Sequence, residues 1–101
     1  MKTKNELEKI PEEFKADILK AIDILKEAGA EKIYIFGSLI NDDYNESSDI
    51  DIGFKGDIDN YFKVLGKLIM KLEHDVDLME FEEDREIVRY ILKNKEYIEV
   101  A

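Results

Sequence analysis

The sequence predicts an α/β domain in which helices pack on a small β-sheet. Three stretches have apolar side chains at the three-to-four residue spacing that is typical of amphipathic helices. Between them lie short runs of β-branched and aromatic residues, which favour strands. At 101 residues, 45% of them hydrophobic, the chain is long enough to bury one core. We therefore predict a single domain over residues 1–101.

Hydrophobic spacing and capping residues define the helices. Pro11 suits the first position of the first helix and Gly29 its C-terminal stop, while Asp57 or Asp59 could cap the second. The predicted helices span residues 11–28, 59–72 and 83–93. Their predicted buried stripes are, in chain order, Phe14, Ile18, Leu19, Ala21, Ile22 and Leu25; Phe62, Leu65, Leu68, Ile69 and Leu72; and Ile87, Val88, Ile91 and Leu92.

Three strands alternate with these helices, and a fourth is an alternative. A short helical piece is predicted from Ser38, followed by a polar loop over residues 41–48. A short extended tail is predicted at Tyr97, Ile98 and Val100. We therefore expect a sheet of three strands, or of four if this tail joins it. The three main strands are predicted at residues 32–36, 49–54 and 75–81.

Three aspartates are the candidate site residues. Asp49 and Asp51 are two residues apart and share one face of the second strand. Asp77 has the same parity on the third strand, and neighbouring strands lie about 4.8 Å apart. Carboxylate oxygens are the ligands that Mg²⁺ prefers, so we predict that the three aspartates bind one or two Mg²⁺ ions, with Mn²⁺ as a substitute. The bland alternative is a solvated acidic edge in a chain rich in acidic residues.

The turn after the first strand is the candidate phosphate-binding element. Gly37 allows a sharp turn and the close approach of a ligand, and Ser38 opens a helical turn whose hydroxyl and N–H groups can hold phosphate oxygens. Gly53, on the aspartate face, is predicted to leave room beside the carboxylates. Together with the metal site, this pattern suits attack on the α-phosphate of a nucleoside triphosphate.

The composition excludes several classes of protein. The chain has no cysteine, so it has neither a disulfide framework nor a thiolate metal site. No apolar run approaches the ~18 residues that span a bilayer, and the N-terminus lacks the apolar segment of a signal peptide. We predict a cytoplasmic protein with no membrane partner. The net charge of −10 disfavours direct nucleic-acid binding and favours a basic partner.

The motif resembles the minimal nucleotidyltransferase family of the DNA polymerase β-like superfamily. The resemblance rests on Gly37-Ser38, ten further residues and Asp49-Ile50-Asp51, followed by Asp77 between Val76 and Leu78. It implies a mixed sheet of three main strands flanked by helices, catalytic and metal-binding roles for Asp49, Asp51 and Asp77, and nucleotide binding at Gly37 and Ser38.

The resemblance also implies an activity and a partner. Family members transfer a nucleoside monophosphate from a triphosphate to a hydroxyl group. We expect AMP transfer from ATP to a tyrosine of a HEPN ribonuclease toxin, which would make this chain the antitoxin of the pair. Two alternatives are a module that neutralises its partner by docking alone, and a small-molecule (antibiotic-type) nucleotidyltransferase completed by homo-oligomerisation.

One feature of the candidate phosphate loop favours the docking alternative. Residues 39–48 contain no Lys or Arg, so phosphate binding would depend on the metal, on backbone N–H groups and on Lys55, Lys63 or Lys67. Outside the motif we expect no catalytic role: His74 is predicted as a turn residue, and Tyr44 and Tyr90 as packing or surface groups.

Overall fold

The sheet is mixed and has four strands in the part of the chain that is described. The computed structural model describes residues 10–40, 44–45, 47–81, 86–94 and 97–101. The sheet order is β3-β2-β1-β4; β1 is antiparallel to β2 and β4, whereas β2 and β3 are parallel. The strands are β1 Lys32–Phe36, β2 Ile50–Lys55, β3 Val76–Glu80 and β4 Tyr97–Glu99. This confirms the predicted mixed sheet and, of its two forms, the one in which the C-terminal tail joins as a fourth strand.

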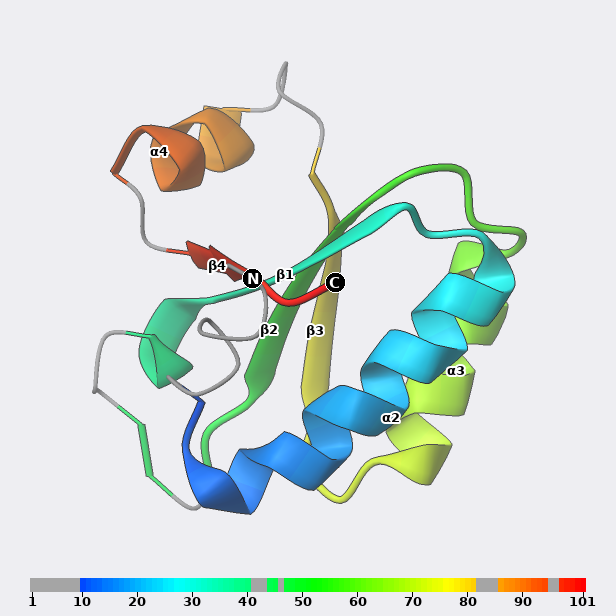
Figure 1. Ribbon diagram of the computed structural model, residues 1–101, viewed down its shortest axis with the longest axis horizontal. Helices are drawn as coiled ribbons and strands as arrows, with labels where there is room; N and C mark the ends of the chain where they lie inside the picture. The colour runs from blue at the N-terminus through cyan, green and yellow to red at the C-terminus, as the bar shows by residue number, and fades with distance from the viewer. Residues whose placement is uncertain (1–9, 41–43, 46, 82–85, 95–96) are drawn as a thin grey trace.

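Helices cover both faces of this sheet (Figure 1). The first predicted helix is α2 (Glu12–Ala28), which Gly29 ends in a left-handed conformation with φ 116°. Helix α3 (Tyr61–Lys71) forms the crossover that a parallel β2–β3 pair requires. Helix α4 (Glu86–Asn94) lies across the sheet from α2 and α3 (Figure 1). A 3-10 turn, η1 (Gly37–Leu39), follows β1 and begins one residue before the predicted short helix.

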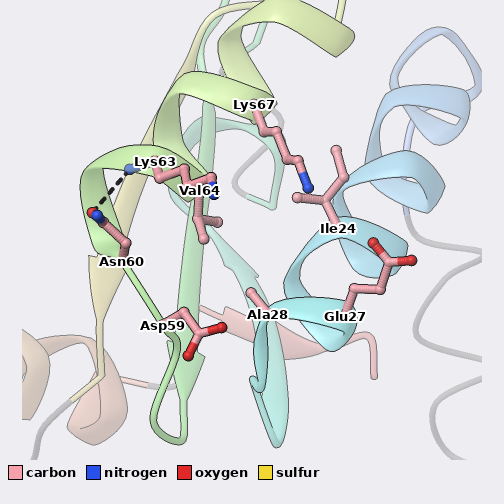
Figure 2. A pocket seen from close by; sticks show the side chains of 8 residues that line it. All are labelled: Ile24, Glu27, Ala28, Asp59, Asn60, Lys63, Val64 and Lys67. Carbon is pink, nitrogen blue, oxygen red and sulfur yellow. Dashed lines mark hydrogen bonds between the residues drawn. The ribbon is translucent and has the colours of Figure 1, made fainter.

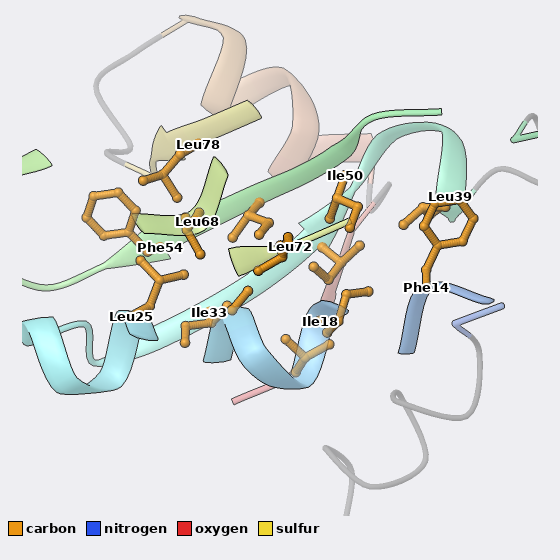
Figure 3. Close-up of a cluster of buried hydrophobic side chains, with 14 of the residues drawn as sticks. Phe14, Ile18, Leu25, Ile33, Leu39, Ile50, Phe54, Leu68, Leu72 and Leu78 are labelled. Atoms are coloured by element: carbon orange, nitrogen blue, oxygen red, sulfur yellow. The ribbon is translucent and has the colours of Figure 1, made fainter. Parts of the chain in front are cut away.

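The main core lies between the sheet and the α2–α3 layer (Figure 3). Alternation along β1 and β2 places Ile33, Ile35, Ile50 and Ile52 in it, facing Ile18 and Leu25 of α2 and Leu68 of α3. A second cluster occupies the other face, beneath α4, and consists of Tyr34, Phe36, Phe81, Val88 and Ile91. Asp51 of β2 and Asp77 of β3 therefore lie on the face of the sheet that α4 covers, which we call the α4 face.

The predicted stripes were wrong at several positions. Leu19, Phe62, Ile69 and Ile87 are exposed, with Phe62 78% accessible, whereas Val64 of α3 is buried. The apolar residues of α3 cover an arc wider than the face that packs, so hydrophobic spacing does not fix the centre of the buried face, and packing against the sheet and α2 decides it. The side chain of Leu92 lies outside the described residues.

The cap of α3 also differs from the prediction. Asn60 precedes the helix, and its side-chain oxygen accepts the Lys63 backbone N–H at 3.2 Å. Asp57 lies too early in the chain, because an N-cap side chain reaches N–H groups only two or three residues ahead, and Asp59 stands one residue before the N-cap position that Asn60 occupies. Within the described ranges, no helix has the length and apolar character needed to cross a membrane.

Candidate functional site

Asp51 and Asp77 lie side by side on neighbouring strands. They are register partners in the parallel β2–β3 pair, and Phe36 of β1 is the register partner of Asp51 on its other side. Parallel strands about 4.8 Å apart bring side chains of one rung into close proximity on the same face. The predicted common face of Asp51 and Asp77 is therefore confirmed.

The environment of Asp51 disfavours its ionised form. Burial raises the pKa of the Asp51 carboxyl to about 6, and the negative charges of Asp77 and then Asp49 add to this effect. Asp77 and Asp49 are both exposed, so water solvates their charges more fully. A cation between these groups would replace mutual repulsion with attraction.

Asp49 stands just outside the strand rather than on the same rung. It directly precedes β2 and acts on Asp51 through its charge. In the described part of the chain, no three His, Cys, Asp or Glu side chains are gathered closely enough to form a metal-ligating group. Convergence of all three predicted aspartates on a common ion thus stays a prediction, whereas the Asp51–Asp77 pair is in place.

Gly37 turns the chain directly against Asp51. Its φ is +82°, a conformation that side-chain-bearing residues rarely adopt. A Cβ atom added to Gly37 would lie 2.1 Å from Oδ2 of Asp51, so a side chain there would displace the carboxylate. Glycine is thus required at this position both for the turn and for contact with the site. The side chain of Ser38 lies outside the described residues.

Gly53 was predicted to leave room beside the carboxylates, and this prediction was wrong. Gly53 does lie on the face of Asp51, but a Cβ atom there would sit 2.4 Å from the Phe81 ring. That ring stacks on Tyr34 with centroids 5.0 Å apart and packs in the cluster beneath α4. The space beside Gly53 is filled by protein and forms an aromatic wall next to the aspartates.

The three candidate phosphate-binding lysines lie away from this site. Lys55 pairs with Lys32 at the opposite end of the β1–β2 ladder, and its Nζ lies 5.9 Å from the Tyr34 ring centroid. Lys63 and Lys67 belong to α3 and line a cavity of about 210 Å³ against α2, on the other face of the sheet (Figure 2). None of these three lysines therefore lies beside Gly37 and Asp51.

One buried charge was missed by sequence reasoning. Asp17 of α2 is 3% accessible, and its Oδ2 lies 2.7 Å from Nδ1 of His74. Burial by itself raises the pKa of Asp17, but hydrogen bonds from His74 and from the backbone of Glu73 and His74 outweigh it, so the pKa lies below its ordinary value. The available signal was a lone carboxylate three residues after Phe14, within the apolar stripe of α2.

The remaining predictions about single residues agree with the structure. His74 lies in the turn before β3, as predicted. Tyr44 packs edge-on against Phe14 with ring centroids 5.9 Å apart, next to the main core, and Tyr90 is exposed on α4.

The mixed sheet, the crossover helix and the carboxylate pair beside a glycine turn define a nucleotidyltransferase-type α/β domain. The chain belongs to the polymerase β nucleotidyltransferase family, because the family model described as "Polymerase beta, Nucleotidyltransferase" matches residues 19–99. Comparison with the curated proteins finds no significant match.

Solved structures of toxin–antitoxin pairs have a similar fold. A chain in the crystal structure of a toxin-antitoxin with AMP-PNP is 26% identical, with a TM-score of 0.65 over 82% of this chain and 71% of that chain. A mutant MntA-HpeT toxin-antitoxin is also 26% identical, with a TM-score of 0.62 over 83% and 71% of the respective chains. The toxin-antitoxin MntA-HepT, at 24% identity and a TM-score of 0.60 over 85% and 70%, supports the fold alone.

Proposed function

We propose that this chain is a metal-dependent nucleotidyltransferase that moves AMP from ATP to a tyrosine hydroxyl of a HEPN-type ribonuclease toxin and so acts as its antitoxin. The observation that carries the transferase part is the Asp51–Asp77 rung with Gly37 turned against it. Family membership supports the same reaction class. The toxin–antitoxin identity of the similar structures, one of them with AMP-PNP, supports the nucleotide and the kind of partner.

The donor atoms available at the site fit a divalent metal. Asp51 and Asp77 offer hard carboxylate oxygens on one rung, and Asp49 supplies a third negative charge nearby. Bound Mg²⁺, one ion or two, would stabilise the developing charge on the oxygens of an in-line displacement at the α-phosphate. In this proposal Asp49, Asp51 and Asp77 would bind the metal. Mn²⁺ should be able to replace Mg²⁺ at this site.

The roles of the remaining site residues follow from the chain itself. Gly37 lets the main chain pass close to the carboxylate of Asp51, and a triphosphate would approach along this backbone together with Ser38. Neither residues 39–48, which contain no Lys or Arg, nor the three candidate lysines, which lie elsewhere, supply a side-chain cation for the phosphates. ATP binding should therefore depend strongly on the metal.

A macromolecular acceptor would have to approach the α4 face of the sheet. In-line attack requires the acceptor oxygen within about 3–3.5 Å of the α-phosphate, on the side where Asp51 and Asp77 lie. Helix α4 packs on Phe36, the register partner of Asp51, and carries the exposed residues Ile87 and Tyr90 one helical turn apart. The net charge of −10 suits a basic protein such as a ribonuclease.

The decisive experiment is a transfer assay with matched aspartate variants. The chain is mixed with its candidate toxin, ATP and Mg²⁺, and the toxin is analysed by intact-mass and peptide mass spectrometry. We expect an AMP-sized mass increment on one tyrosine, and its loss with Asp49→Asn or Asp51→Asn. Asp57→Asn is the control, because it removes the same charge from an exposed turn outside the site and should leave transfer unchanged.

The contrary results separate the alternatives. Toxin neutralisation that survives Asp51→Asn without any mass change would identify a docking module, which the lysine-free loop favours. Labelling of small molecules alone would identify a small-molecule transferase. As a surface test, Tyr90→Ser should reduce transfer to the toxin, whereas Met70→Ser, at an exposed position of α3 on the other side of the sheet, should not.

A further inference from the structure

The buried pair of Asp17 and His74 joins α2 to the chain segment that leads into the site. Oδ2 of Asp17 accepts the backbone N–H groups of Glu73 and His74, each at 2.9 Å, and lies 2.7 Å from Nδ1 of His74. An ionised carboxylate can only accept hydrogen bonds, so Nδ1 carries the proton in this contact. Among the described residues, Asp17 is the only buried charged or polar side chain.

Such a carboxylate is costly to bury unless several donors satisfy it. Here three donors do so, and all three come from two consecutive residues of the α3–β3 turn. The His74 ring also lies against Phe14 of α2, with ring centroids 4.2 Å apart. The turn is therefore fixed to α2 by polar and aromatic contacts at the same point.

This turn determines where β3 begins. Directly after His74, the carbonyl of Asp75 accepts the Ile50 N–H at 2.8 Å. Ile50 then pairs with Val76, and Asp51 with Asp77. The fixed turn thus lies three residues before Asp77 and borders the first hydrogen bond of the β2–β3 ladder.

Strand β3 pairs with another strand on one side only, so contacts outside the ladder help to set its register. It lies at the edge of the sheet. A shift by two residues would keep Leu78 and Val76 parity on the buried face, yet it would place Asp75 or Met79 opposite Asp51. The buried Leu78, whose carbonyl accepts a hydrogen bond from the Tyr61 hydroxyl, opposes this shift from the middle of β3, and the Glu73–His74 turn opposes it at the start of the strand.

We propose that Asp17 is a positioning residue for the carboxylate pair: by holding the Glu73–His74 turn against α2, it fixes the β3 register that places Asp77 beside Asp51. This role rests on the proposed metal-dependent function. It explains why a helix that otherwise buries an apolar stripe contains a buried aspartate 60 residues before the site residue that it serves.

The test measures Mn²⁺ affinity, by electron paramagnetic resonance of free Mn²⁺, for folded chains. Asp17→Asn weakens all three hydrogen bonds by removing the charge and should lower Mn²⁺ affinity roughly tenfold or more, as loss of outer-shell support typically does. Leu25→Val, in the buried stripe near the other end of α2, is the control for general destabilisation and should change the affinity less than twofold.

Two further variants separate positioning from mere packing. His74→Asn keeps a side-chain N–H donor near the place of Nδ1 and should retain Mn²⁺ affinity within about threefold, whereas His74→Leu lacks the donor and should lose affinity as Asp17→Asn does. Hydrogen exchange should show faster exchange of the β3 amides in Asp17→Asn and His74→Leu only.

The outcomes distinguish the two proposals. Equal Mn²⁺ affinity in Asp17→Asn and Leu25→Val, with binding intact in the unmodified chain, would overturn the positioning role and leave the proposed function standing. If the unmodified chain binds no Mn²⁺, the proposed function fails, and the positioning role fails with it.

Discussion

Replacing Asp51 by Asn should make the metal-free protein more stable at neutral pH while it abolishes transfer. In the folded chain, burial and the charges of Asp77 and Asp49 raise the pKa of Asp51 from 3.8 to about 6. A group whose folded-state pKa is raised in this way binds more protons in the folded state, so folding stability falls as the pH rises from about 4 to 6. The loss is nearly complete about one pH unit above this pKa, and Asn removes it.

The magnitude follows from the size of the shift. One pK unit corresponds to about 1.4 kcal/mol, so a rise of about two units sets an upper limit of about 3 kcal/mol. Because Asp51 is partly exposed, solvent screening lowers this value, and we expect a gain of about 1–2 kcal/mol in the free energy of unfolding at pH 7. For a domain of this size, each kcal/mol raises Tm by about 4–8 °C.

Urea titrations of both proteins in EDTA, at pH 7 and at pH 4, measure this gain. The expected difference is present at pH 7 and absent at pH 4, where Asp51 is protonated in the folded chain. A gain of equal size at both pH values would refute the electrostatic reasoning. Unfolding of the variant would show that the Asp51 carboxylate holds the fold together.

Three further predictions concern the same structure. Gly37→Ala should destabilise the fold by about 1 kcal/mol or more and abolish transfer, because Gly37 has φ +82° and its new methyl group would meet the Asp51 carboxylate; urea titration and the toxin assay measure both. The pKa of Asp17 is lowered in the folded state, so its ionised carboxylate stabilises the fold above about pH 4 and loses this effect on further acidification. Asp17→Asn should abolish this contribution, which an acid titration followed by circular dichroism tests. ATP should bind far more weakly in EDTA than in Mg²⁺ by calorimetry, and equal affinities would show that phosphate contacts exist that we have not identified.

Part of this protein could be predicted from the sequence because the relevant physics is local. Alternation along a strand fixes which residues share a face, so the common orientation of Asp51 and Asp77 followed from their parity. Gly37 was identifiable because a strand that ends in glycine marks a turn in which a side chain is not tolerated. The end of α2 followed from Gly29, which adopts a left-handed conformation there. The predicted start was one residue early, because Pro11 has an extended ψ of 143° and precedes the helix instead of occupying its first position.

Other features depended on contacts between segments that are distant in the sequence. Asp17 and His74 are 57 residues apart, and their hydrogen bond exists only because α2 packs beside the α3–β3 turn. Phe81 occupies the space beside Gly53 because α4 folds onto that face of the sheet. The way in which the helices and strands pack also decides three other features. These are the exposure of Phe62, the distance of Lys63 and Lys67 from the aspartates, and the pairing of β4 with β1. The sequence alone determined which residues could form a metal-binding face, through strand parity and turn chemistry. Tertiary packing decided what surrounds that face, because burial and long-range hydrogen bonds depend on how whole elements meet.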